Sequence, residues 1–399
     1  MMDITIKPSS LCGTVSAIPS KSQAHRLLIC SAFADQPTTL YCPETNRDMD
    51  ATADCLNSLG ADIVRTNDGY QVIPIKTVPK TAVLPCCESG STLRFLLPVV
   101  GALGVDATFL MEGRLSQRPL SPLWELMEEK CCSLSRPTEN TIRCTGKLKP
   151  GVFPIAGNIS SQFISGLLFA SSIMEGTSQI QIQGKLESAP YVKMTQLALD
   201  QFGISSDDYC VSGKLPLHSP GNMTVEGDWS NAAFFLAAKQ LGNAVSVKNL
   251  NEGSPQGDRA IADILPLLES FQIIDGTDIP DLIPILAVVA GAKNGAEFQD
   301  IGRLRLKESD RIESTRNMLR ALGADSKATA DTLTVYPAKY HGGTVDACND
   351  HRIAMAAAIA ATVASGNVTI LGAQCTEKSY PNFWKIYREL GGSYEQHLR

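Results

Sequence analysis

The chain has 399 residues, too many for one hydrophobic core of typical size, so two domains of roughly 200 residues each are expected. Hydrophobic residues make up 44% of the chain and charged residues 19%, as in soluble globular proteins, and the formal net charge is -6. This balance gives no global reason to bind nucleic acid or an anionic membrane, so anionic ligands must be held by local groups of cations.

Two further features narrow the class of protein. Residues 1–7 alternate like a strand and lack the apolar segment of a signal peptide, and no stretch of about 18 apolar residues could span a bilayer. We therefore expect a cytoplasmic protein with no membrane partner. The 12 cysteines show no zinc spacing, and the pairs 86–87 and 131–132 are adjacent, so we expect reduced, apolar core residues rather than metal ligands. We also expect no cofactor.

The first predicted unit begins at residues 19–26, where small hydroxyl residues, Lys21 and Arg26 stand before an apolar run. A helix that starts here would combine free N–H groups and a positive dipole end with two cations, which favours a bound phosphate or carboxylate. Taken alone, the stretch also fits an ordinary capped helix with solvated charges. The unit continues as a strand, a helix and a β-hairpin, predicted at 38–41, 48–59 and 62–73.

Similar polar starts recur along the chain, near residues 90, 160, 229, 281 and 350. Successive starts are about 70 residues apart, except that the starts near 229 and 281 are about 52 residues apart. A missing final hairpin in the fourth unit would explain this shorter distance. Further strands are predicted at 107–110, 141–143, 178–182, 244–247, 296–299, 332–335 and 368–370. Further helices are predicted at 121–130, 191–202, 231–241, 258–270, 310–322 and 380–390. The repetition predicts an α/β protein of six βαβαββ units, grouped most simply as three units in each of two domains.

Seven short motifs, rich in cations, hydroxyl residues and glycine, occur in order along the chain. They lie at residues 20–26, 89–94, 114–120, 160–163, 303–311, 350–352 and 378–381. Together they closely resemble the motifs of the 5-enolpyruvylshikimate-3-phosphate synthase family, and the resemblance covers essentially the whole chain.

The resemblance implies a two-domain inside-out α/β barrel with its active site in the interdomain cleft. One domain would comprise residues 1–18 plus 227–399, and residues 19–226 would form the inserted domain. The implied reaction transfers the enolpyruvyl group of phosphoenolpyruvate to the 5-hydroxyl of shikimate 3-phosphate, through a tetrahedral intermediate, and releases phosphate. Such a transferase would serve the shikimate pathway, and thereby chorismate and aromatic amino-acid biosynthesis. We expect a monomer whose partners are these two small molecules.

By the same resemblance, two overlapping sets of residues would hold the substrates. Phosphoenolpyruvate would be bound by Lys21, Gly90, Arg114, Gln162, Arg311, Arg352 and Lys378. Shikimate 3-phosphate would be bound by Lys21, Ser22, Arg26, Ser160, Ser161, Gln162, Ser188, Tyr191, Asp281 and Lys307. Glycine suits position 90 because a side chain would intrude where the backbone approaches the ligand; alternatively, the helix start needs an unusual φ there.

Two carboxylates would divide the proton transfers of this reaction. Asp281 would take the proton of the 5-hydroxyl, and Glu308 would donate a proton to the methylene carbon and later remove one. Lys21 would assist the departing phosphate. Each carboxylate also has a simpler interpretation, since Asp281 could be solvated and Glu308 could pair with Lys307.

Two other functions stay open from the residues. UDP-N-acetylglucosamine enolpyruvyl transferase shares the implied fold but carries a reactive Cys in a mobile loop, and the corresponding residues 112–118 contain none. A noncatalytic phosphate-ligand-binding protein would not need carboxylates among its cations, and neither GxxxxGK[ST] nor a strand-linked GxGxxG occurs. Two positions depart from the family pattern, because Glu88 and Arg303 stand where Asn is common.

Overall fold

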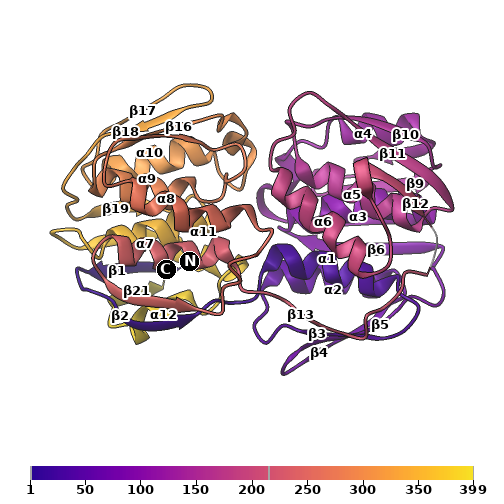
Figure 1. Ribbon diagram of the computed structural model, residues 1–399, viewed down its shortest axis with the longest axis horizontal. Coiled ribbons are helices and arrows are strands. Elements are labelled where there is room, and N and C mark those ends of the chain that lie inside the picture. Colours follow the sequence, from indigo (N-terminus) through magenta and orange to yellow (C-terminus); the bar gives the residue numbers. More distant parts are fainter. Residues whose placement is uncertain (1, 214–215, 399) are drawn as a thin grey trace. The chain divides into compact units, whose positions relative to one another are not determined.

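The computed structural model describes residues 2–213 and 216–398, which form a mixed α/β fold (Figure 1). The chain is divided into two compact units. The discontinuous unit combines Met1–Ile18 with Gly227–Arg399, and the inserted unit is Pro19–Glu226. Each unit has its own core of buried apolar side chains.

The inserted unit contains three sheets among its described residues, and each has one parallel pair of strands followed by antiparallel strands. The strand orders are β13-β3-β5-β4, β6-β7-β9-β8 and β10-β11-β12. The strands are β3 (Thr38–Tyr41), β4 (Asp62–Thr66), β5 (Gly69–Ile73), β6 (Thr81–Cys87), β7 (Asp106–Met111), β8 (Cys132–Ser135), β9 (Thr141–Gly146), β10 (Val152–Ala156), β11 (Gly176–Gln183), β12 (Cys210–Gly213) and β13 (Asn222–Thr224).

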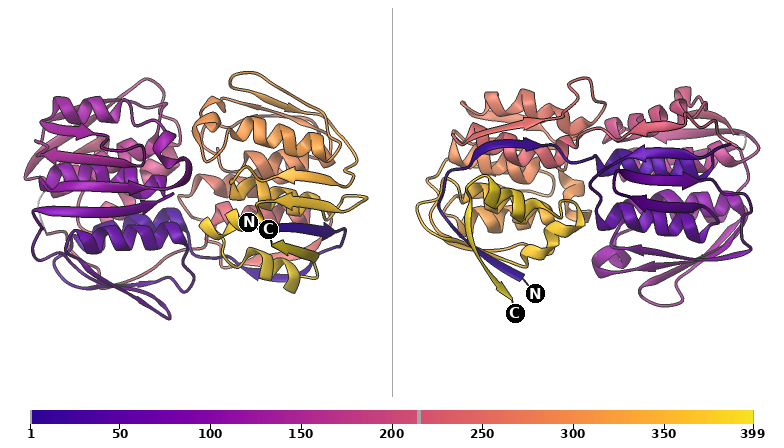
Figure 2. Two further views of the ribbon diagram at one scale, coloured as in Figure 1. Left: turned by 180° about the vertical axis from the view of Figure 1, so that it is seen from behind. Right: turned by 90° about the horizontal axis from the view of Figure 1, so that it is seen from below.

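The discontinuous unit also contains three sheets among its described residues, with the orders β19-β20-β1-β21, β15-β16-β18-β17 and β14-β2. The strands are β1 (Met2–Lys7), β2 (Cys12–Ser16), β14 (Ala244–Lys248), β15 (Gln272–Asp275), β16 (Ala296–Gln299), β17 (Ser326–Ala328), β18 (Leu333–Val335), β19 (Gly343–Asp346), β20 (Val368–Leu371) and β21 (Ser393–Leu398). The first and last strands, β1 and β21, lie side by side and antiparallel (Figure 2). In the sheet with two described strands, β14 lies between the polar starts near 229 and 281, where the spacing is shortest, and its partner β2 comes from the start of the chain.

The helices that connect neighbouring parallel strands are mostly apolar and almost completely buried, as helices without an exposed polar face must be. They are α3 (Gly90–Leu103), α5 (Ser161–Ile173), α9 (Ile283–Ala292) and α11 (His351–Ala360). The other α-helices are α1 (Lys21–Ala32), α2 (Arg47–Ser58), α4 (Leu123–Glu129), α6 (Ala189–Gln201), α7 (Trp229–Gln240), α8 (Ile261–Leu267), α10 (Arg311–Ala321) and α12 (Phe383–Glu389). In the part of the chain that the structure describes, no helix is long and apolar enough to cross a membrane.

Several helices start where the sequence places its polar motifs. Side chains of Ser20, Ser89, Asp228 and Asp350 accept hydrogen bonds from backbone N–H groups and so cap α1, α3, α7 and α11. One predicted helix is shorter than expected, because residues 257–260 form a 3-10 turn and α8 runs only from 261 to 267. The capped starts place motif residues at the amino ends of these helices.

Candidate active site

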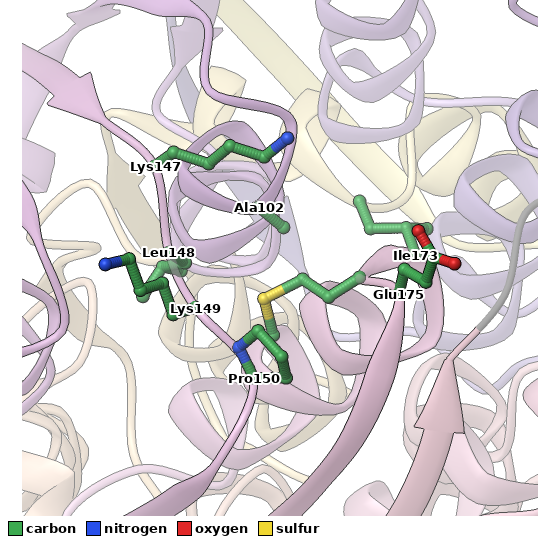
Figure 3. Close-up of a pocket in the computed structure, with 8 residues that line it drawn as sticks. Ala102, Lys147, Leu148, Lys149, Pro150, Ile173 and Glu175 are labelled. Carbon is green, nitrogen blue, oxygen red and sulfur yellow. The ribbon is translucent and has the colours of Figure 1, made fainter.

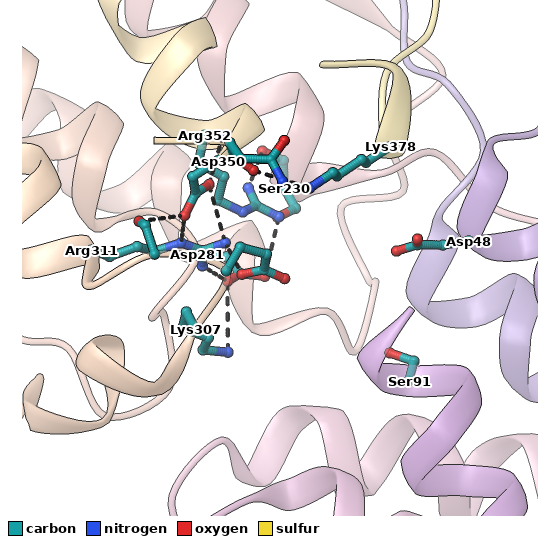
Figure 4. Close-up of polar contacts among 12 residues, drawn as sticks. Asp48, Ser91, Ser230, Asp281, Lys307, Arg311, Asp350, Arg352 and Lys378 are labelled. Atoms are coloured by element: carbon teal, nitrogen blue, oxygen red, sulfur yellow. Dashed lines mark hydrogen bonds and ion pairs between the residues drawn. The ribbon is translucent and has the colours of Figure 1, made fainter. Parts of the chain in front are cut away.

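In the discontinuous unit, the predicted residues gather around the guanidinium of Arg311, the first residue of α10 (Figure 4). Its Nε donates to Asp350 Oδ2 at 2.8 Å, Nη1 to Asp281 Oδ1 at 2.6 Å and Nη2 to Glu308 Oε2 at 2.6 Å. The side chain is only 1% exposed. Burial acts to lower the pKa of Arg311, but Asp350, Glu308 and Asp281 outweigh it and raise the pKa well above its ordinary value. This guanidinium is therefore a permanently charged centre that orients three carboxylates.

Asp281 lies just before α9 and is held by three cations. Besides Arg311, Arg352 Nη2 lies 3.1 Å from its Oδ2, and Lys307 Nζ lies 3.9 Å from its Oδ1. Burial favours the neutral acid, but Arg352, Lys307 and Arg311 together lower the pKa of Asp281 well below its ordinary range. Asp281 is thus ionised, and the simpler interpretation of a solvated surface carboxylate is wrong.

Asp350 connects Arg311 to the start of α11. Its Oδ1 accepts from the backbone N–H of Arg352 at 3.0 Å, and its Oδ2 accepts from Ser309 Oγ at 3.0 Å. The carboxylate is fully buried. It is absent from the predicted site residues, although it lies in the motif at 350–352, and its cap position was the signal that could have identified it.

Two lysines complete this group. Burial lowers the pKa of Lys307 to about 8, because Asp281 only partly offsets the loss of solvent and Arg311 repels the ammonium. Lys378, at the end of the 3-10 turn Ala373–Lys378, donates to the backbone oxygen of Asn349 at 3.1 Å. The expected alternative partner of Glu308 was Lys307, whereas the structure pairs Glu308 with Arg311.

In the inserted unit, Arg26 is held by neutral groups. Its Nε donates to Thr195 Oγ1 at 2.8 Å, Nη2 to the Tyr191 carbonyl at 2.7 Å and Nη1 to the Ser22 carbonyl at 2.5 Å. Its guanidinium also stands 5.1 Å from the centre of the Phe95 ring. Burial lowers the pKa of Arg26 to about 10, so the side chain stays charged at neutral pH. The structure thus brings together three of the residues predicted for shikimate 3-phosphate.

Lys21 is the first residue of α1. Its Nζ lies 2.8 Å from Asp48 Oδ2, and both side chains are largely buried. A lysine that meets the positive end of its own helix dipole is unfavourable unless an anion is near, so Asp48 compensates for this position.

Gly90 opens α3, and a side chain there would have to displace the ends of two arginine side chains. A Cβ at this position would lie 2.6 Å from Arg118 Nη1 and 2.7 Å from Arg94 Nη1. Its φ is not in the left-handed region, so the alternative explanation of an unusual φ does not apply. Arg94 Nη1 donates to Gln162 Oε1 at 3.3 Å, and Gln162 Nε2 donates to Ser91 Oγ at 2.9 Å. Arg94 and Arg118 were not predicted as site residues, although both lie in recognised motifs.

The remaining predicted residues lie at other helix starts of the inserted unit. Ser160 and Ser161 begin α5, and Ser188 precedes α6 in the left-handed region with a φ of 55°. Arg114 is exposed on the 3-10 turn Gly113–Gln117. Within residues 2–213 and 216–398, no three His, Cys, Asp or Glu side chains are arranged to hold a metal ion.

A cavity of about 560 Å³ lies elsewhere in the inserted unit (Figure 3). It is lined by Ala102, Lys147, Leu148, Lys149, Pro150, Ile173, Met174 and Glu175. Ala102 and Ile173 lie at the carboxyl ends of α3 and α5, whereas the candidate site residues lie at the amino ends of these helices. The cavity is therefore separate from the candidate site.

Comparisons with known proteins relate the whole chain to one enzyme family. The family model described as EPSP synthase (3-phosphoshikimate 1-carboxyvinyltransferase) matches residues 6–387. A 3-phosphoshikimate 1-carboxyvinyltransferase of Clostridium acetobutylicum is 38% identical over 417 residues, with 98% of this chain and 97% of the relative covered. The protein of the same name from Clostridium kluyveri is 34% identical, with 99% of each chain covered.

Solved structures share the fold of this chain. An EPSP synthase from Acinetobacter baumannii has a TM-score of 0.80 at 21% identity, with 100% of both chains covered. The enolpyruvyl transferase NikO from Streptomyces tendae has a TM-score of 0.78 at 17% identity, with 100% of this chain and 99% of that chain covered. The match of the family model over nearly the whole chain, together with relatives above 30% identity, establishes that this chain belongs to the EPSP synthase family.

Proposed function

We propose that this chain transfers the enolpyruvyl group of phosphoenolpyruvate to the 5-hydroxyl of shikimate 3-phosphate and releases phosphate, as a transferase of the shikimate pathway. The observation that carries the proposal is the pair of carboxylates, Asp281 and Glu308, that one buried guanidinium of Arg311 holds at 2.6 Å each. A reaction between two anions needs cations to bind phosphates and carboxylates, and it needs separate groups to move protons. Family membership favours this function over transfer to UDP-N-acetylglucosamine and over noncatalytic binding.

We assign the substrates to the residues expected from the family motifs. Phosphoenolpyruvate is assigned to Lys21, Gly90, Arg114, Gln162, Arg311, Arg352 and Lys378. Shikimate 3-phosphate is assigned to Lys21, Ser22, Arg26, Ser160, Ser161, Gln162, Ser188, Tyr191, Asp281 and Lys307. Both units supply residues to both substrates, so we propose that the units close on them and exclude water from the reacting atoms.

The proposed chemistry is an addition followed by an elimination. Asp281 takes the proton of the 5-hydroxyl as its oxygen bonds to C2 of phosphoenolpyruvate, while protonated Glu308 donates to the methylene carbon C3. In the tetrahedral intermediate, Glu308 removes a proton from the new methyl group, the double bond re-forms, and the bond from C2 to the phosphate oxygen breaks. The ammonium of Lys21 stabilises the charge of the departing phosphate.

Substrate binding is expected to strengthen Asp281 as a base. Its pKa lies low because Arg352, Lys307 and Arg311 stabilise the carboxylate against the effect of burial. Anionic substrates would pair with the same cations and reduce this stabilisation, so the pKa of Asp281 would rise as the site fills. Proton transfer would then depend on both substrates being present.

For the whole chain we propose the inside-out α/β barrel of the family, with six βαβαββ units, three in each domain. Support comes from the six sheets among the described residues, since each contains one parallel pair of strands. The cytoplasmic location, the monomeric state and the absence of a cofactor stay predictions from the sequence.

Phosphate release from phosphoenolpyruvate tests the function directly. The enzyme is incubated with shikimate 3-phosphate or with UDP-N-acetylglucosamine, without added metal. We expect release only with shikimate 3-phosphate. Release only with the nucleotide sugar would contradict the proposed acceptor, and no release with either acceptor would favour a noncatalytic binding protein.

Small-angle scattering tests the proposed closure. Saturating shikimate 3-phosphate should reduce the radius of gyration, with shikimate as a control that lacks the phosphate. An unchanged radius at saturation would contradict closure.

A further inference from the structure

A chain of four buried polar groups links three helices of the inserted unit. Nδ1 of His25 in α1 lies 2.7 Å from Thr52 Oγ1 in α2, which lies 2.7 Å from Thr92 Oγ1 in α3. Thr92 Oγ1 donates to Oγ of Ser89, the residue that caps α3, at 2.7 Å. All four residues are fully buried. Buried polar groups of this kind are costly unless their hydrogen bonds are directed consistently.

The number of hydroxyl protons fixes the protonation of the histidine. Thr92 has one hydroxyl proton, which it donates to Ser89 Oγ. The Asp48 carbonyl, 3.5 Å from Thr92 Oγ1, could accept only this same proton. In either case Thr92 has no proton left to donate to Thr52. Thr52 must therefore give its own proton to Thr92 and accept from His25. It follows that His25 carries its hydrogen on Nδ1 and that Nε2 is unprotonated.

The surroundings agree with a neutral ring. Nε2 of His25 is buried and has no hydrogen-bond partner among the described residues, so a proton there would have no acceptor. The charged groups that act on the ring are Lys21 and Arg26, and Lys21 is itself paired with Asp48 from α2. Burial, followed by these two cations, lowers the pKa of His25 well below its ordinary value.

The histidine also contacts a ring that it shares with Arg26. His25 packs edge-on against Phe95, with ring centres 6.4 Å apart, and Arg26 lies over the same Phe95 ring. This series of hydrogen bonds ends at Ser89, the cap beside Gly90. It begins at His25, which lies between Lys21 and Arg26 in the sequence of α1. A single network thus connects the cations of one helix start with the glycine of another.

We propose that His25, as its neutral Nδ1–H tautomer, is a positioning residue that holds the amino-terminal parts of α1, α2 and α3 in register through Thr52, Thr92 and Ser89. In this role it sets the positions of Lys21, Arg26 and Gly90 relative to one another. It transfers no proton to the substrates. The consequence for catalysis rests on the proposed function, whereas the tautomer does not.

Nitrogen-15 NMR of histidine-labelled, substrate-free protein tests the tautomer. His25→Asn identifies the His25 signals by their disappearance. We expect a protonated Nδ1 and an unprotonated Nε2 that do not change between about pH 5 and pH 9, whereas an ordinary histidine would titrate in this range. A protonated Nε2, or a titration, would overturn the proposal. Since no turnover is measured, this result is independent of the reaction that the enzyme catalyses.

Steady-state kinetics tests the positioning role. His25→Leu and Thr52→Val each interrupt the chain and should raise the KM values for both substrates and lower kcat/KM by roughly 10- to 100-fold, as misplaced binding groups do. His25→Asn should recover most of this loss, because its amide nitrogen lies near the place of Nδ1. The double variant His25→Leu/Thr52→Val should lose no more than either single variant.

Ser171→Ala is the matched control, because it removes a buried hydroxyl of α5 in the same unit. A merely structural role of His25 would reduce the amount of folded enzyme, and with it the apparent kcat, without changing KM. Normal KM values in folded His25→Leu or Thr52→Val would therefore overturn the positioning role, as would equal losses in the Asn and Leu variants.

Discussion

Arg26 in the inserted unit and Arg311 in the discontinuous unit are both buried, but their partners differ in charge. Arg26 donates to two carbonyls and a hydroxyl, whereas Arg311 donates to three carboxylates. Burial lowers the pKa of Arg26 to about 10, while carboxylates outweigh burial and raise the pKa of Arg311. Neutral partners leave the positive charge of Arg26 for an incoming anion, whereas the charge of Arg311 is already used to organise Asp281, Glu308 and Asp350.

The comparison assigns different tasks to the two units. Under the proposed function, the inserted unit would attract and align anions through its helix starts and through Arg26, whose partners are neutral. The discontinuous unit presents carboxylates whose positions are fixed by cations, as proton transfer requires. Substitutions in the two regions should therefore differ in whether they affect folding, turnover or binding.

The largest effect is expected from Arg311→Met, which removes the common partner of three carboxylates. The free energy of unfolding should fall by about 3–5 kcal/mol, as when one partner of a buried ion pair is lost. Urea unfolding measures the change. Arg316→Met on the same helix is the control, since it breaks a more exposed pair with Glu313 and should cost less than about 1 kcal/mol. Similar losses for both variants would contradict the organising role of Arg311.

Glu308→Gln should separate turnover from binding. The amide oxygen can still accept from Arg311, but the side chain can no longer exchange a proton, so kcat should fall about 10²- to 10⁴-fold. The affinity for shikimate 3-phosphate, measured by calorimetry, should change little. Glu313→Gln provides the control in the first turn of α10. Equal losses of turnover and affinity would contradict the role assigned to Glu308.

Arg26→Gln should mainly weaken binding. Loss of a charge-assisted contact should raise the KM for shikimate 3-phosphate roughly 10-fold or more. Arg26→Lys should retain part of the affinity, because it keeps the charge but lacks the planar fork. If the variant instead unfolds as readily as Arg311→Met, Arg26 has the same structural role as Arg311.

The smallest effect is the pH dependence due to Lys307. Its pKa is about 8 in the folded chain, against an ordinary 10.5, so its charge is lost as the pH rises through 8. The KM for shikimate 3-phosphate should therefore increase above pH 8 in the native enzyme and stay flatter in Lys307→Arg. A native profile that is flat up to pH 10 would contradict this assignment.

Lys307 also affects the stability of the fold, but here a rise in pH is favourable, whereas it weakens binding. Between pH 8 and 10.5 the unfolded chain binds more protons at Lys307 than the folded chain does. This residue therefore makes the free energy of unfolding rise with pH across that window. Urea unfolding of the native chain and of Lys307→Arg at pH 8 and pH 10 isolates the contribution.

Local signals in the sequence predicted the helix starts well. Ser20, Ser89 and Asp350 cap helices from positions immediately before them, and such caps depend only on neighbouring residues. The strand β6 was not predicted, because it contains Pro85 and becomes a strand through parallel pairing with β7. Pairing of this kind depends on residues distant in the chain, which a local pattern does not reveal.

The sequence predicted most residues of the candidate site, but not the contacts between them. The motif at 303–311 identified Glu308 and Arg311, and the resemblance added Asp281, yet the geometry depends on Arg311 reaching partners 30 and 39 residues away. The approach of Arg118 to Gly90 likewise depends on tertiary packing. The hydroxyl chain of His25 could not be predicted either, because it joins three helices through side chains whose types are common in cores.

The interruption of the discontinuous unit has a consequence for synthesis on the ribosome. Leu11 donates to Asn243 across 232 residues, and β1 pairs with β21 at the other end of the chain. The inserted unit is continuous in sequence and can fold as soon as residue 226 has emerged, whereas the other unit must keep its first strands unpaired until much later. The unit that carries Asp281 and Glu308 is therefore completed last, and a nascent chain acquires the helix starts proposed to align anions before the carboxylates proposed to transfer protons.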